Sequence, residues 1–178
     1  MSTKKFSKQC HKENDQLGKN AGVLHLVQAA SINRVWVNTA RTGVDIHFTR
    51  TDGSVGTLEC EVKKAWEGGK FPYETINALG RKGKFFETGA AWLLLSNNKQ
   101  DYLLVSGEDI IASPMEEVRN QYSLTGEMFY KVPVSKAIFW RFGTPLYELP
   151  VDCGECASTV IDCSDKTNIC CGQCGRER

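Results

Sequence analysis

The stretch from Gly43 to Lys63 constrains the fold most, because it alternates apolar and polar residues on both sides of a strong turn signal. Apolar residues occupy every second position of both arms: Val44, Ile46, Phe48, Leu58, Cys60 and Val62. The Asp52-Gly53 pair between the arms is typical of a tight turn between antiparallel strands. Period-two alternation around such a turn predicts a β-hairpin with one apolar face and one polar face.

An amphipathic helix is predicted for residues 11–30. Leu17, Ala21 and Leu24 step by four and three residues, which is the spacing of one helix face. Glu13 lies four residues before Leu17, so we expect it on the N-terminal extension of the same buried stripe. A carboxylate in that position lies near the sheet rather than on the solvated side of the helix.

The remaining segments predict a mixed α/β fold. Strands are expected at residues 33–37, 90–95, 102–105, 131–134 and 137–142. Helices are expected at residues 114–121 and from Pro72 to an end or kink near Gly80 and Gly83. The apolar run at 90–95 is typical of a central strand that is buried on both faces. Taken in order, the central elements are a helix, three strands, a helix and two strands, which implies a mixed sheet with helices on both faces.

Composition divides the 178 residues into three parts. Residues 1–10 carry lysines and no acids, and are expected to form a flexible basic arm, either solvated or laid against phosphates. Residues 11–148 form the α/β domain, and residues 149–178 form a cysteine-rich tail. With 22 basic and 21 acidic residues the formal charge is +1, so any nucleic-acid contact has to come from local patches.

Hydropathy and the N-terminal residues bear on location. The chain has no run of about 18 apolar residues, and its N-terminal lysines are not followed by the apolar core of a secretory signal. We therefore expect no membrane span and a cytoplasmic location, which for a viral protein is the host cytoplasm. In a reducing compartment, clustered cysteines bind metal more often than they form disulfides.

The tail holds six of the eight cysteines. Two C-x₂-C pairs have the spacing of tetrahedral zinc ligands: Cys153, Cys156, Cys171 and Cys174. This pattern resembles a zinc ribbon, in which Zn²⁺ would supply the stability that so short a segment lacks. Cys163 and Cys170 are surplus, and either replace one ligand or join a cluster of more than one metal. A disulfide-bonded or disordered tail is the alternative.

Charged residues gather on the polar face of the hairpin. Asp45 lies on the face opposite Val44, and Glu61 and Lys63 share a face of the return strand. A loop with an odd number of residues would set Asp45 opposite Glu61, whereas a two- or four-residue loop would set it opposite Cys60 and require a bulge. Two carboxylates and an ammonium on one sheet face suit a divalent cation beside a phosphodiester.

Neighbouring residues leave other interpretations open. Glu59 shares the face of Glu61, so it is a ligand, a group that supports the ligands, or an ordinary exposed acid. His47 shares the face of Asp45, and a single histidine on a strand is more often exposed than catalytic. The whole set also fits a solvated strand face with a cross-strand ion pair.

The order of elements, Asp45 and the Glu61-Val62-Lys63 triplet together resemble the PD-(D/E)xK nuclease superfamily. The resemblance covers residues 11–142, with Val44 in place of the leading proline of the family pattern. It implies a restriction-endonuclease-like, three-layer α/β/α fold with a central mixed sheet. Glu13 resembles the first-helix glutamate of the Holliday-junction-resolvase branch.

The resemblance also implies an activity and residue roles. Asp45, Glu61 and the carbonyl of Val62 would bind Mg²⁺ (or Mn²⁺), an ion that takes oxygen ligands. Glu13 would orient a metal-bound water or bind a second ion, and Lys63 would polarise the attacking water or stabilise charge on the phosphate. The implied reaction is endonucleolytic hydrolysis of DNA that leaves a 5′-phosphate, in the resolvase branch at branched DNA and by a homodimer. An RNA substrate or a sequence-specific site fits the same residues, since fold does not fix substrate.

Basic residues lie on both sides of the predicted second helix. Five are expected to contact nucleic-acid phosphates: Lys64, Lys70, Arg81, Lys82 and Lys84. A charge run is also typical of a solvated surface. The alternative function is a non-catalytic, zinc-containing nucleic-acid-binding protein with vestigial carboxylates, and a third is a protein-interaction domain with a metal-clamped tail.

Overall fold

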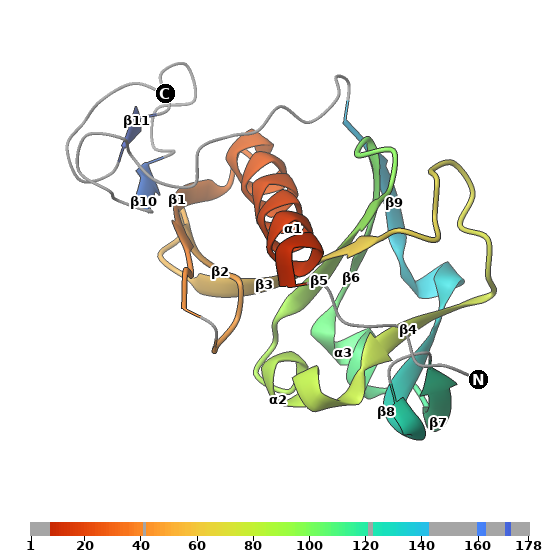
Figure 1. Ribbon diagram of the computed structural model, residues 1–178. Helices are drawn as coiled ribbons and strands as arrows, with labels where there is room; N and C mark the ends of the chain where they lie inside the picture. Colours follow the sequence, from red (N-terminus) through yellow and green to blue (C-terminus); the bar gives the residue numbers. More distant parts are fainter. Residues whose placement is uncertain (1–7, 41, 121–122, 143–159, 163–169, 172–178) are drawn as a thin grey trace.

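A computed structural model describes residues 8–40, 42–120, 123–142, 160–162 and 170–171 (Figure 1). The chain begins with a long helix and three antiparallel strands: α1 (Lys8–Gln28), β1 (Ile32–Val37), β2 (Ile46–Arg50) and β3 (Val55–Lys63). They confirm the first helix, the first strand and the hairpin that the sequence predicts. The helix starts at Lys8 rather than at residue 11, and residues 1–7 of the predicted arm lie outside the described residues.

Shorter elements make up the rest of the described chain. They are β4 (Thr75–Leu79), η1 (Gly80–Lys82), α2 (Gly83–Phe86), β5 (Ala91–Ser96), β6 (Asp101–Val105), α3 (Gly107–Ile111), β7 (Met115–Asn120), β8 (Ser123–Pro133), η2 (Val134–Lys136), β9 (Ile138–Arg141), β10 (Val160–Asp162) and β11 (Cys170–Cys171). The predicted strands at 90–95, 102–105 and 137–142 are β5, β6 and β9. Within the described ranges, no helix is long and apolar enough to cross a membrane.

The strands form two sheets. The central sheet has the order β11-β10-β1-β2-β3-β5-β6-β9, and the small sheet has the order β4-β8-β7. In the central sheet β5 runs parallel to β3, while the other neighbours are antiparallel. The predicted α/β fold with a mixed central sheet is therefore confirmed.

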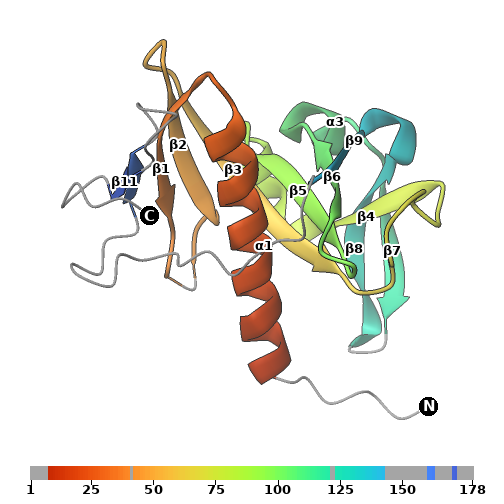
Figure 2. The ribbon, with the colours of Figure 1, turned by 90° about the horizontal axis from the view of Figure 1, so that it is seen from above.

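Each face of the central sheet is covered by a different layer (Figures 1 and 2). Helix α1 covers one face and packs on Leu58, Cys60 and Leu93. The small sheet and the short helices cover the opposite face, where Ile76 and Val132 pack with Trp92 and other residues of β5 and β6. Helices therefore lie on both faces, as expected, but those on the second face are short and share it with a three-stranded sheet.

The buried side of α1 overlaps only in part with the predicted stripe, since Ala21 is fully buried and Leu24 packs against the core. Leu17 and Leu24 are half-buried, whereas Gly18 and Gly22 are buried against β3. A Cβ atom at Gly22 would lie 2.6 Å from Cδ1 of Ile46 and 2.7 Å from Sγ of Cys60. The helix thus approaches the sheet so closely that its central contact positions need glycine.

Two predicted helices are strands. Residues 72–79 contain β4, whose burial alternates with period two and whose Ile76 pairs with Val132. Residues 114–121 contain β7, which forms a hairpin with β8. The apparent helical spacing was misleading because β8, a partner distant from β4 in sequence, fixes the extended conformation. The short helix α3 begins after Ser106, whose side chain accepts a hydrogen bond from the Asp109 backbone N–H.

The tail is described only at two short strands. β10 pairs with β1, and β11 pairs with β10, so the tail extends the central sheet at its β1 edge. Cys170 and Cys171 form β11. The other predicted zinc ligands lie outside the described residues: Cys153, Cys156, Cys163 and Cys174. The zinc ribbon therefore stays a prediction.

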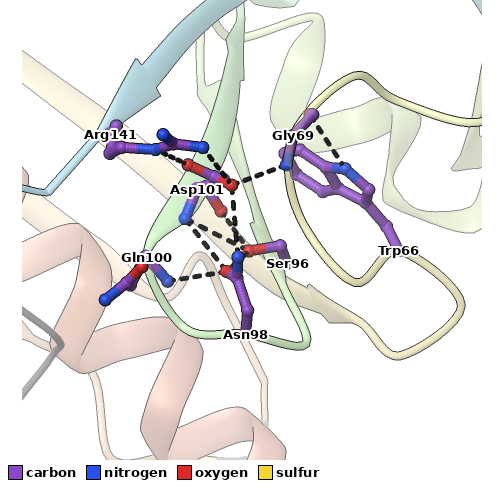
Figure 3. A network of polar contacts seen from close by, with 7 residues as sticks. All are labelled: Trp66, Gly69, Ser96, Asn98, Gln100, Asp101 and Arg141. Atoms are coloured by element: carbon purple, nitrogen blue, oxygen red, sulfur yellow. Dashed lines mark hydrogen bonds and ion pairs between the residues drawn. The ribbon is translucent and has the colours of Figure 1, made fainter.

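A buried carboxylate fixes the segment that leaves β3 (Figure 3). Asp101 is fully buried and accepts hydrogen bonds from Arg141 Nε at 2.5 Å and Nη2 at 3.0 Å, and from the Gly69 backbone N–H at 2.6 Å. The Trp66 indole donates to the Gly69 carbonyl at 3.2 Å. This network ties β6, β9 and the β3–β4 connection together. The pKa of Asp101 is lowered to about 2, and the hydrogen bonds from Arg141 are the largest cause.

The Gly22→Val substitution tests the close approach of α1. The added side chain has to displace Ile46 and Cys60, so the free energy of unfolding should fall by about 2 kcal/mol in urea titrations. Gln28→Val places the same side chain at an exposed position of α1 and should cost less than about 0.5 kcal/mol. Equal effects at the two positions would contradict the packing described above.

The Asp101 network should make stability depend on pH. The folded pKa of Asp101 lies below its ordinary value of 3.8, so the contribution is present above that pH and is lost as the pH falls toward 2. Because Arg141 is largely exposed and screened, we expect about 1–2 kcal/mol. Asp101→Asn should lower the free energy of unfolding by this amount at pH 6, and the difference should shrink near pH 2.5. A constant difference across this range would exclude the assignment.

Candidate active site

The candidate site lies where β2 and β3 separate. Their pairing runs from Thr49–Val55 to Ile46–Leu58, whereas β3 continues beside β5 to Lys63. Beyond Leu58, the Cys60 backbone N–H donates to Oδ2 of Asp45 at 2.9 Å instead of to a strand carbonyl. A side-chain carboxylate therefore takes the place of the strand at the open end of the hairpin.

The observed register changes the acid that faces Asp45. Thr49 and Val55 are the strand pair nearest the turn, and the loop between them has an odd number of residues. The sequence predicted that such a loop would set Asp45 opposite Glu61. Continuing the ladder by one residue beyond Ile46–Leu58 sets Asp45 opposite Glu59. The prediction that an odd loop sets Asp45 opposite Glu61 is therefore wrong. The turn is centred on Asp52, whereas a pairing of Asp45 with Glu61 would centre it one residue later, on Gly53.

Glu59 is the most deeply buried carboxylate of the site. It is 1% exposed and lies beside Trp92 of β5, on the face covered by the small sheet. Its Oε2 accepts a hydrogen bond from Nζ of Lys82 at 2.5 Å, and its buried Oε1 has no hydrogen-bond partner. Burial raises the pKa of Glu59, and the charge of Asp45 adds to the rise, while Lys82 opposes it.

A second lysine reaches the site from α1. Lys19 is buried, and its Nζ lies 2.9 Å from Oδ2 of Asp15 and 3.6 Å from Oδ1 of Asp45. Lys19 was not predicted as a site residue, because the predicted stripe placed it away from the sheet. Its position between Gly18 and Gly22 was the available signal, since paired glycines on a helix can mark close packing.

Glu61 and Lys63 lie further along the same strand face, and both are half-buried. Burial raises the pKa of Glu61, and the charge of Lys63 is the largest of the opposing effects. Asp45 also acts electrostatically on Glu61. Val62 points to the other face, where its side chain packs in the core beneath α1. Glu61 and Lys63 thus flank the Asp45–Glu59 pair rather than form its centre.

Glu13 is exposed on α1. The prediction that it extends the buried stripe is wrong, since the stripe packs in the core from Ala21 onward, while Leu17 is half-buried and Glu13 is exposed. Glu13 precedes Lys19, the α1 residue that pairs with Asp45, by about 9 Å along the helix axis. His47 is exposed as well, as expected for a single strand histidine.

The predicted basic cluster divides into one interior residue and several exposed ones. Lys82 is paired with Glu59 inside the site, and its pKa is raised because that pairing outweighs the effect of burial. Arg81 is exposed and pairs with Glu127 at 3.2 Å. The other residues are exposed: Lys64, Lys70 and Lys84. Lys82 therefore belongs with the carboxylates and not with the outer surface.

Carboxylate oxygens are the ligand type that a hard divalent ion takes, but the site offers only a small number of them. Among the described residues, no group of three or more His, Cys, Asp or Glu side chains is arranged to hold a metal. Mg²⁺ usually takes one or two carboxylates and completes its shell with water and phosphate. Asp45 and Glu59 supply that pair, and Oε1 of Glu59 is a buried oxygen without a partner. The donors present therefore fit Mg²⁺.

Comparison of the chain with protein-family models, curated proteins and solved structures finds no match.

Removal of the Lys82 charge should destabilise the protein. Lys82→Met leaves Glu59 buried without its cation, so the free energy of unfolding should fall by about 3 kcal/mol. Adding Glu59→Gln to this variant should restore much of the loss, because the buried charge is then removed as well. Lys84→Met, at an exposed position nearby, should change stability by less than about 0.5 kcal/mol. A double variant no more stable than Lys82→Met would argue against the buried pair.

Proposed function

We propose that this protein is a divalent-metal-dependent endonuclease that hydrolyses phosphodiester bonds in DNA. The observation that carries the proposal is the buried Glu59 beside the half-buried Asp45 at the open end of the hairpin, with one oxygen of Glu59 unpartnered. Carboxylates buried at such a position are costly unless they bind a cation, so their presence suggests a functional role.

Asp45 and Glu59 would hold Mg²⁺ or Mn²⁺, with Glu61 beside them. When bound, such an ion supplies positive charge that activates water and neutralises a phosphodiester. Lys63 lies next to Glu61 on the same strand face and is half-buried, so its ammonium is available to stabilise negative charge on the phosphate.

The path of the chain also supports the proposal. Helix α1, the β1–β2–β3 meander and β5 parallel to β3 follow the order expected from the resemblance to PD-(D/E)xK nucleases. The connection from β3 to β5 departs from it, since it contains β4 and short helices instead of one long helix. The register favours Glu59, rather than Glu61, as the acid beside Asp45.

The exposed residues Lys64, Lys70 and Lys84 would contact the phosphates of the substrate around the site. With Glu13 exposed, the feature that pointed to branched DNA loses its support. The proposed substrate is therefore DNA in general, and Holliday junctions and cleavage by a homodimer are specific cases within it.

A second function, nucleic-acid binding without cleavage, is favoured by a different observation. Asp45 and Glu59 are each already paired with a lysine, Lys19 and Lys82 respectively. Carboxylates balanced in this way can serve as structural ion pairs with no metal. Binding of DNA by the protein without any cleavage would support this alternative.

Cleavage of supercoiled plasmid and of a four-way junction in Mg²⁺, Mn²⁺ and EDTA tests the proposal. Asp45→Asn and Glu59→Gln should each lower the rate about 100-fold or more, since each removes a proposed metal ligand. Glu67→Gln changes an exposed acid that accepts hydrogen bonds from Asn97, and should cut at the wild-type rate. Equal cutting by all variants would identify a contaminating nuclease and defeat the proposal.

A further inference from the structure

The ammonium of Lys82 sits against Glu59 where a metal ion would bind. We infer that Lys82 acts as an internal counter-ion of this site, and that a divalent ion binds Asp45 and Glu59 only by displacing it. The inference rests on the proposed function, which needs a divalent ion at these two carboxylates. It adds a defined competitor for that ion within the chain itself.

The contacts of Glu59 support a position shared by two cations. Its side chain is 2% exposed, and the Lys82 side chain that covers it is 22% exposed. Lys82 satisfies Oε2 alone, while Oε1 stays buried without a partner. The Lys82 ammonium therefore leaves one of the two Glu59 carboxylate oxygens without a hydrogen bond. A divalent ion offers more charge and several coordination positions, so it can bind this oxygen as well.

The segment that carries Lys82 allows the ammonium to leave without moving the backbone. Lys82 ends the single turn η1 and is followed by Gly83, where a Cβ atom would lie 2.6 Å from the Tyr130 hydroxyl oxygen. The Tyr130 side chain of β8 therefore lies directly against the backbone at Gly83. The four-carbon side chain of lysine is flexible, so rotation of its torsions is enough to withdraw the ammonium from Glu59.

The opposite side of the site can release its cation too. Lys19 lies 3.6 Å from Asp45 but 2.9 Å from Asp15, its partner one helical turn away. It therefore keeps a closer partner when a metal takes Asp45. Displaced Lys82 stays near Glu61, which acts on it electrostatically, and its amine becomes available to an incoming phosphate.

Amine labelling of the unaltered protein tests the displacement directly. A short pulse of acetic anhydride with and without saturating Mg²⁺, followed by peptide mass spectrometry, compares Lys82 with Lys84 in the same molecule. Release from Glu59 should raise the acetylation of Lys82 about tenfold and should leave the acetylation of Lys84 unchanged. A tenfold rise corresponds to a change of about 1.4 kcal/mol in the free energy of exposing the Lys82 amine. Unchanged labelling of Lys82 in protein shown to bind the ion would overturn the inference.

Mn²⁺ affinity, measured by calorimetry, provides a second test. Lys82→Met should bind Mn²⁺ about tenfold more tightly than the wild type, because the competitor is gone. Lys136→Met removes the same charge at an exposed position outside the proposed site and should bind as the wild type does. Glu59→Gln should abolish binding in either background.

The outcomes separate this inference from the proposed function. Equal Mn²⁺ affinity in the wild type and Lys82→Met, lost in Glu59→Gln, would leave the metal site in place and exclude the displacement. Absence of Mn²⁺ binding in the wild type and in Lys82→Met would defeat both. Should Lys82→Met fail to fold, the labelling of the wild type decides the question.

Discussion

The close approach of α1 to β3 is the constraint on which the rest of the structure depends. Gly18 and Gly22 leave no side chain between the helix and Cys60, so the backbones of the two elements lie near each other. The same approach carries Lys19 to Asp45, whose carboxylate binds the Cys60 backbone N–H. Helix packing and the charge balance of the site are therefore set by one contact.

Charge balance explains why acids can be buried at the open end of the hairpin. Asp45 and Glu59 lie near each other, and each has a lysine from a different layer: Lys19 from α1 and Lys82 from η1. These ion pairs balance the carboxylates without a bound ion, while one oxygen of Glu59 stays without a partner. The proposed metal binding would thus draw on the same carboxylates as stability.

Local patterns predicted part of this arrangement. Period-two alternation and Asp52-Gly53 identified β2 and β3, and the apolar run identified β5. The pattern misled at residues 72–79 and 114–121, because both segments extend against β8, and only that long-range pairing makes them strands. The sequence placed Asp45 and the acids of β3 on the two arms of the hairpin, as the structure does. It did not predict that Lys19 and Lys82 pair with these acids, since both lysines reach them from elements whose orientation depends on packing.

The sequence by itself determined the hairpin, the mixed α/β class and the presence of acids on one strand face, because these follow from residue spacing along a single segment. Only the tertiary structure decided which acid stands beside Asp45 and which lysines neutralise the pair. Register depends on where the turn begins, and the buried face of α1 depends on which residues let it approach the sheet. Both are properties of two surfaces in contact, so neither one can be read from one strand or one helix alone.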